Sequence, residues 1–74
     1  MSPLHVLRLE APDFWVDVRL RRHDGRWIAS ADTRDGPTLG LGRNPVEALV
    51  QALDPFDGAI DELVASIPDH LYWR

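Results

Sequence analysis

The chain has 74 residues, with 8 basic and 12 acidic side chains, 45% hydrophobic residues and no cysteine. A chain this short buries only about 60% of the surface that its unfolded form exposes. We therefore predict that residues 1–74 form one small domain without a deep cofactor pocket. The lack of cysteine excludes disulfides and thiolate metal sites. No apolar run reaches the roughly 18 residues of a membrane span, and no signal peptide is recognisable, so we expect a cytoplasmic protein without a membrane partner.

The acidic residues are unevenly distributed, and every basic residue is an arginine. Residues 1–43 hold seven arginines and six acids, whereas residues 44–74 hold six acids and Arg74 alone. The net charge of -4 argues against direct DNA binding, because affinity for a duplex comes mostly from neutralising its phosphates. A basic protein is a more compatible partner, although a solvated helix face is the simplest explanation of the acids.

Alternation of apolar and polar residues predicts strands in the first half of the chain. Leu4–Glu10 alternates weakly and stops before a proline, which indicates an edge strand or an ordered tail. Phe14–Arg22 alternates clearly, and Asp24-Gly25 is typical of a two-residue type I′ turn, so Arg26–Thr33 is the returning strand. In this hairpin residue n faces residue 49 minus n, which places Trp27 on the apolar face.

A short third strand is expected over Thr38–Gly42, after a turn at residues 35–37. Gly40 and Gly42 lie within it at alternate positions. Because glycine has no side chain, these positions allow another backbone to approach closely.

A capped helix is predicted to begin at Pro45. Asn44 can act as the N-cap, proline suits the first turn, and Glu47 follows the cap by three residues. Apolar residues then recur at spacings of three and four, which places them on one side of a helix. They are Val46, Leu49, Val50, Leu53, Phe56, Ile60, Leu63, Val64 and Ile67.

Pro55 interrupts this helical pattern. Proline removes a backbone hydrogen bond and clashes with the preceding turn, so we expect a kink or a break that divides the helix into two segments. Asp54 would cap the second segment, and Pro68 would end it. The last residues, Pro68–Arg74, could add a final strand or cover a sheet edge.

These elements predict an α+β fold with a three- or four-stranded antiparallel sheet, in β-β-β-α-β order, and one kinked or broken helix packed on one face. So small a sheet has exposed edges, which can pair with another chain. A homo-oligomer, most simply a dimer formed through the sheet edges or the tail around Trp73, is therefore expected.

The order of elements and three sequence stretches resemble the HicB-like antitoxin family. The stretches are residues 24–29 (Asp-Gly-Arg-Trp-Ile-Ala), 35–37 (Asp-Gly-Pro) and 40–49 (Gly-Leu-Gly-Arg-Asn-Pro-Val-Glu-Ala-Leu). The resemblance covers about Phe14 to Ile67, and the chain resembles the short, stand-alone members of the family. It implies a partial ribonuclease-H-like fold that binds and neutralises a small basic RNA-cleaving toxin and is not itself an enzyme.

Two features depart from the family pattern. The proline-glycine that usually precedes the third strand is inverted here as Gly36-Pro37. The chain also has no room for the C-terminal DNA-binding module of full-length antitoxins, so autorepression by this chain alone is not expected.

The partner-binding residues expected from the sequence are acidic. Glu47, Asp54 and Asp61 are spaced seven apart and would line the polar side of the helix, with Glu62 beside them. Such a row of carboxylates can compete for the basic surface of an RNA-binding toxin through charge-assisted pairs.

Two alternatives remain open. One is a stand-alone dimeric domain of unassigned role. The other is a metal-dependent nuclease, because Asp17 and Asp32 would face each other across the hairpin and paired carboxylates can hold a divalent metal. No further carboxylate has an assignable position near them, so no cofactor or metal site is predicted.

RNA contact is a further alternative. Arg19, Arg21, Arg22 and Arg26 lie near tryptophans in the hairpin, and arginine with an aromatic ring can stack on unpaired bases. Because Trp27 is expected in the core, only Trp15 would remain outside, and solvated strand residues explain the arginines more simply.

Overall fold

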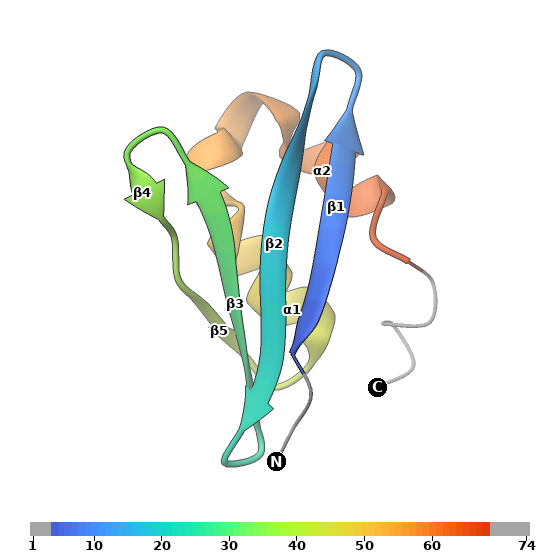
Figure 1. The fold of residues 1–74 in the computed structure, drawn as a ribbon. Coiled ribbons are helices and arrows are strands. Elements are labelled where there is room, and N and C mark those ends of the chain that lie inside the picture. Colours follow the sequence, from blue (N-terminus) through green and yellow to red (C-terminus); the bar gives the residue numbers. More distant parts are fainter. Residues whose placement is uncertain (1–3, 69–74) are drawn as a thin grey trace.

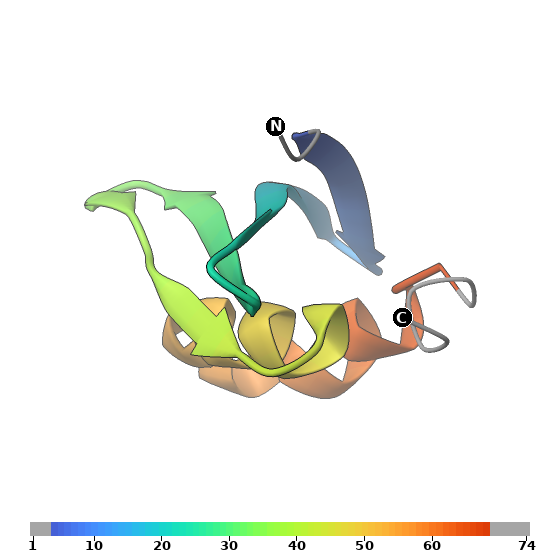
Figure 2. The same cartoon turned by 90° about the horizontal axis from the view of Figure 1, so that it is seen from below.

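The computed structural model describes residues 4–68, which form two layers. An antiparallel sheet makes one layer, and all the helical segments cover one of its faces (Figures 1 and 2). The α+β architecture predicted from the sequence is therefore confirmed. The predicted final strand, with Trp73, lies outside the described residues.

The sheet is a meander whose neighbouring strands are all antiparallel. β1 pairs with β2, β2 with β3, and the return along the other side of β3 is divided between β4 and β5. The strands are β1 (His5–Ala11), β2 (Phe14–His23), β3 (Arg26–Thr33), β4 (Gly36–Pro37) and β5 (Gly40–Gly42).

The predicted hairpin register is correct. Pairs from Val18 with Ala31 to His23 with Arg26 all follow the expected sum of 49. Asp24 and Gly25 have φ angles of 52° and 74°, the left-handed conformations that a type I′ turn requires. The weakly alternating N-terminal segment is an edge strand, β1, rather than a loose tail.

The expected third strand differs in detail from the prediction. Gly36–Pro37, placed in a turn by the sequence, pairs with Asp32 and Thr33 as β4. The strand is then interrupted where the Thr38 hydroxyl accepts a hydrogen bond from the Ala31 amide, at 2.9 Å, and it resumes at Gly40. A side chain here replaces one bond of the strand ladder.

Close approach of another backbone to β5 is confirmed. The helix α1 (Pro45–Ala52) lies directly against the two glycines. A Cβ atom on Gly40 would lie 2.5 Å from the Ala52 nitrogen, and one on Gly42 would lie 2.6 Å from the Ala48 nitrogen. Only glycine permits this contact between strand and helix.

The helical layer begins as predicted. Asn44 has an extended backbone, and its Oδ1 accepts a hydrogen bond from the Glu47 amide at 2.8 Å, so it is the N-cap of α1. After α1 come a 3₁₀ segment, η1 (Asp54–Ala59), and a short helix, α2 (Ile60–Ala65).

Pro55 coincides with a complete break in the helix. The α-helix stops at Ala52, Pro55 occupies the first turn of η1, and Phe56 leaves the helical range with φ -96° and ψ 41°. The prediction that Asp54 caps the second segment is wrong. Asp54 lies inside the first turn of η1, and no side chain caps η1 or α2.

The core lies between the sheet and the helices. The buried apolar residues are Leu9, Val16, Val18, Leu20, Trp27, Ala29, Ala31, Ala48, Leu49, Ala52, Leu53, Leu63 and Ile67. Val50, expected on the apolar side of the helix, is instead 37% exposed. The face of α1 against the glycine-bearing strand uses Ala48 and Ala52, because only small side chains fit at that short distance.

None of the helices within residues 4–68 is long and apolar enough to cross a membrane.

Candidate functional site

The helical layer carries charge of one sign. Residues 44–68 contain five carboxylates and neither arginine nor lysine. All five side chains are exposed: Glu47, Asp54, Asp57, Asp61 and Glu62. We call this set the acidic helical surface.

The four acids singled out from the sequence do not form one row. Glu47 lies on α1, Asp54 on η1, and Asp61 and Glu62 on α2, so the break near Pro55 ends the periodicity that would have aligned them. Glu47 lines a shallow hollow with Arg26 near the Asp24-Gly25 turn. Glu62 lies beside the β1–β2 turn, at the opposite end of β2.

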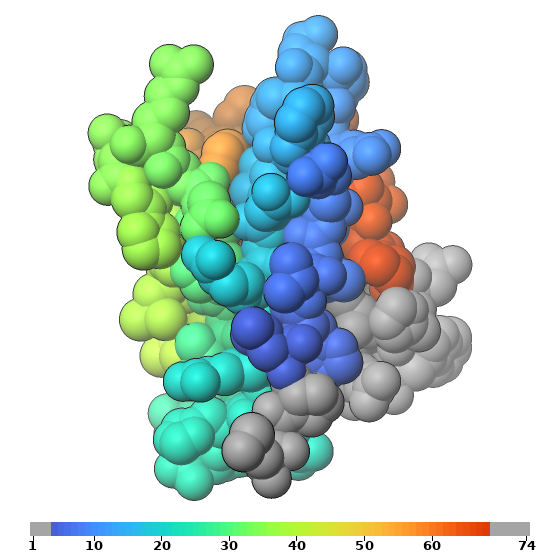
Figure 3. All heavy atoms as spheres, in the orientation of Figure 1, coloured from blue at the N-terminus to red at the C-terminus, as the bar shows by residue number. Residues whose placement is uncertain are grey.

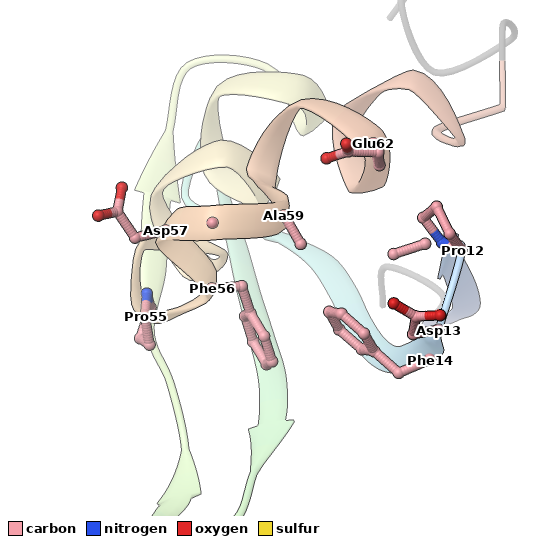
Figure 4. Close-up of a pocket in the computed structure, with 10 residues that line it drawn as sticks. Pro12, Asp13, Phe14, Pro55, Phe56, Asp57, Ala59 and Glu62 are labelled. Carbon is pink, nitrogen blue, oxygen red and sulfur yellow. The ribbon is translucent and has the colours of Figure 1, made fainter.

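A groove that the sequence did not indicate lies beside Glu62. It has a volume of about 530 Å³ and separates the β1–β2 turn from η1 and the start of α2 (Figure 4). The rings of Phe14 and Phe56 stack across it, with centroids 6.1 Å apart and planes inclined by 22°. Asp13, Asp57 and Glu62 supply its carboxylates.

Sequence reasoning missed this groove because its walls are far apart in the chain. From the sequence, Phe14 is assigned to a strand and Phe56 to the apolar side of a helix, and no local pattern links the two residues. The signals available in the sequence were two prolines, Pro12 and Pro55. Each lies next to an aspartate, at a point where the pattern of a strand or a helix is interrupted. The tertiary fold brings the two interruptions together.

The outer face of the sheet, opposite the helices, is uncovered in residues 4–68 (Figures 2 and 3). Its large exposed apolar side chains include Val6, which is 66% exposed, and Trp15, which is 60% exposed. The Arg8 guanidinium lies 5.0 Å from the centroid of the Trp15 ring, a cation–π contact that covers part of this aromatic surface.

Asp17 and Asp32, the two carboxylates of the nuclease alternative, each form an ion pair with a different arginine. Arg8 Nε donates to Asp17 Oδ1 at 3.0 Å, and Arg19 donates to Asp32 Oδ1 at 2.5 Å. Both pairs are about half exposed. Within residues 4–68 no group of three or more acidic or histidine side chains is placed to hold a metal ion.

The four arginines considered for RNA contact do not share one surface. Arg19, Arg21 and Arg26 lie on the outer face of the sheet by strand alternation, whereas Arg22 faces the other side. Arg19 is committed to Asp32. Trp27 is buried, as predicted, so Trp15 is the hairpin tryptophan that remains accessible.

No protein-family model, curated protein or solved structure matches this chain. The likeness to HicB-like antitoxins therefore rests on the sequence stretches quoted above.

Proposed function

We propose that this chain is a non-catalytic interaction domain that binds a small basic protein through its acidic helical surface, as the likeness to HicB-like antitoxins implies. One observation carries the proposal. Residues 44–68 present five exposed carboxylates on one side of the molecule and no basic side chain among them. A negatively charged surface attracts a positively charged partner and repels the phosphates of nucleic acid.

The chemistry of the expected partner agrees with this surface. A toxin that cleaves RNA must hold phosphates, so its working surface carries arginine or lysine. Exposed carboxylates can occupy the same side chains through charge-assisted hydrogen bonds and thereby block RNA. Because Asp17 and Asp32 are paired with arginines on the other face of the sheet, they do not enter this proposal.

Affinity purification from the native cell lysate tests the proposal with two charge-matched variants. Glu47→Lys/Asp61→Lys reverses two charges on the acidic helical surface, whereas Glu10→Lys/Asp35→Lys makes the same change in net charge outside the helical layer. We expect a small basic protein, identified by mass spectrometry, to co-purify with the wild type and the second variant and to be lost with the first. Equal recovery with both variants, or no basic protein, would refute the proposal.

A stand-alone dimer is the second candidate, and the β1 edge favours it. The outer edge of β5 is occupied, because Gln51 Oε1 accepts from the Leu41 amide at 3.2 Å. On β1, Ser66 Oγ accepts from the Glu10 amide at 3.0 Å. Within residues 4–68 this leaves the outward backbone groups of Val6 and Arg8 for another strand, because outward positions alternate along β1.

Light scattering of the purified chain tests this second candidate. Val6→Pro removes the outward amide without touching a bond to β2, and Val6→Thr keeps the amide as the matched control. If two copies pair through β1, the wild type and Val6→Thr are dimers and Val6→Pro is a monomer. If the wild-type chain is a monomer, the stand-alone dimer is excluded.

A further inference from the structure

We propose that the groove between the β1–β2 turn and η1 receives an apolar side chain flanked by basic residues on the bound partner. This rests on the proposed function and names the part of the surface that gives the contact its specificity. Seven of the ten residues that line the groove are nonpolar, so its floor suits an apolar side chain. Phe14 lines the groove, and the residue is 37% exposed although its ring stacks on Phe56.

The rim of the groove determines the charge of the occupant. Its three remaining residues are Asp13, Asp57 and Glu62, and none of them forms an ion pair with another described residue. In Figure 4 the Asp13 carboxylate lies beside the Phe14 ring and Glu62 extends from α2 beyond Ala59, while Asp57 points away. The carboxylates of Asp13 and Glu62 line the same groove as the apolar residues, so together they are complementary to a cationic residue next to an apolar one.

The two walls of the groove are held in place by the rest of the fold. Behind the α2 wall, Leu63 and Ile67 are buried in the core. The hydrogen bond from the Glu10 amide to Ser66 Oγ ties the end of α2 to β1, next to the β1–β2 turn. A groove built on anchored elements requires little ordering when a ligand binds, which favours affinity.

The size of the groove is suited to side chains. A volume of about 530 Å³ lies within the range of roughly 300–1,000 Å³ typical of small-molecule sites, and so accommodates one or two side chains of a peptide. A bare metal ion is a poor occupant, because no set of three or more ligating side chains gathers within residues 4–68.

Nuclear magnetic resonance titration of the full chain with a defined probe tests the inference. The probe is the peptide Arg-Lys-Leu-Lys-Arg, with Arg-Lys-Ser-Lys-Arg lacking the apolar residue and Glu-Glu-Leu-Glu-Glu reversing the charge. We expect the first peptide to shift the amide signals of Phe14, Phe56, Ala59 and Glu62, and both comparison peptides to bind at least about tenfold more weakly.

Two neutralised variants sharpen the test. Asp13→Asn/Glu62→Gln should weaken the first peptide about tenfold, whereas Asp24→Asn/Asp35→Asn, which removes the same charge outside the groove, should leave it unchanged. Shifts confined to Glu47 and its neighbours on α1 would overturn the groove and leave the proposed function standing. Failure of both basic peptides to bind any surface would count against both proposals.

Discussion

Trp27 is the largest buried side chain contributed by the hairpin, and it is only 8% exposed. It faces the helices from β3 and lies beside His5 of β1, with ring centroids 6.3 Å apart. A single residue thus connects β3, the edge strand and the core. Its position was predictable because the Asp24-Gly25 turn fixes the register, and the register fixes the face.

Trp27→Ala should lower the free energy of unfolding by roughly 3 to 5 kcal/mol, because it removes a large core side chain and leaves a cavity. Denaturant unfolding measures the loss, with Trp27→Phe as a variant that keeps an aromatic ring and should lose less. A loss below about 1 kcal/mol for the alanine variant would contradict the face assignment.

Asn44 stabilises the start of α1 through one hydrogen bond, from the Glu47 amide to its side chain. Asn44→Ala should therefore cost about 1 kcal/mol of stability, while Asn44→Asp, which keeps an acceptor, should cost little. The comparison is made on the midpoints of urea unfolding. Equal midpoints for the alanine variant and the wild type would show that the cap contributes nothing.

At the scale of elements, the contact between β5 and α1 depends on the absence of side chains. Gly40→Ala should destabilise the protein by about 1 to 3 kcal/mol or more, because its Cβ would overlap the α1 backbone. Gly58→Ala is the matched control, since a Cβ there meets nothing within 4 Å. Thermal unfolding of both variants measures the difference, and equal melting temperatures would mean that α1 can move away from β5.

The break between α1 and η1 also belongs to the scale of elements. The sequence located the interruption at Pro55, because proline cannot continue a helix. It did not give the path of the chain after the break. Leu53, Leu63 and Ile67 are all buried in one core, so the chain turns at η1 to bring α2 back onto the sheet. The path is decided by burial rather than by a capping side chain.

At the scale of the whole molecule, the helical layer is acidic, while the arginines within residues 4–68 lie in the sheet and its loops. If the acidic surface binds the Arg-Lys-Leu-Lys-Arg peptide, salt should weaken that binding, because it screens exposed charges. Raising ionic strength from about 0.05 M to about 0.5 M should reduce the affinity about tenfold or more, as measured by the same titration. Affinity independent of salt would indicate apolar contact alone.

Stability should respond to salt far less than binding. The ion pairs of Asp17 and Asp32 with arginine are about half exposed, and such pairs contribute little to folding. The fold rests on its apolar core, where no charged or polar side chain is buried among the described residues.

The sequence by itself determined the two hairpin strands and their register, the cap at Asn44 and the interruption at Pro55, because alternation, turn chemistry and capping act over a few residues. Tertiary structure alone decided which surfaces form. It separated Glu47 from Glu62, paired Asp17 and Asp32 with arginines, and brought Phe14 against Phe56. These contacts join residues distant in the chain, and they form because both layers bury their apolar sides in one core.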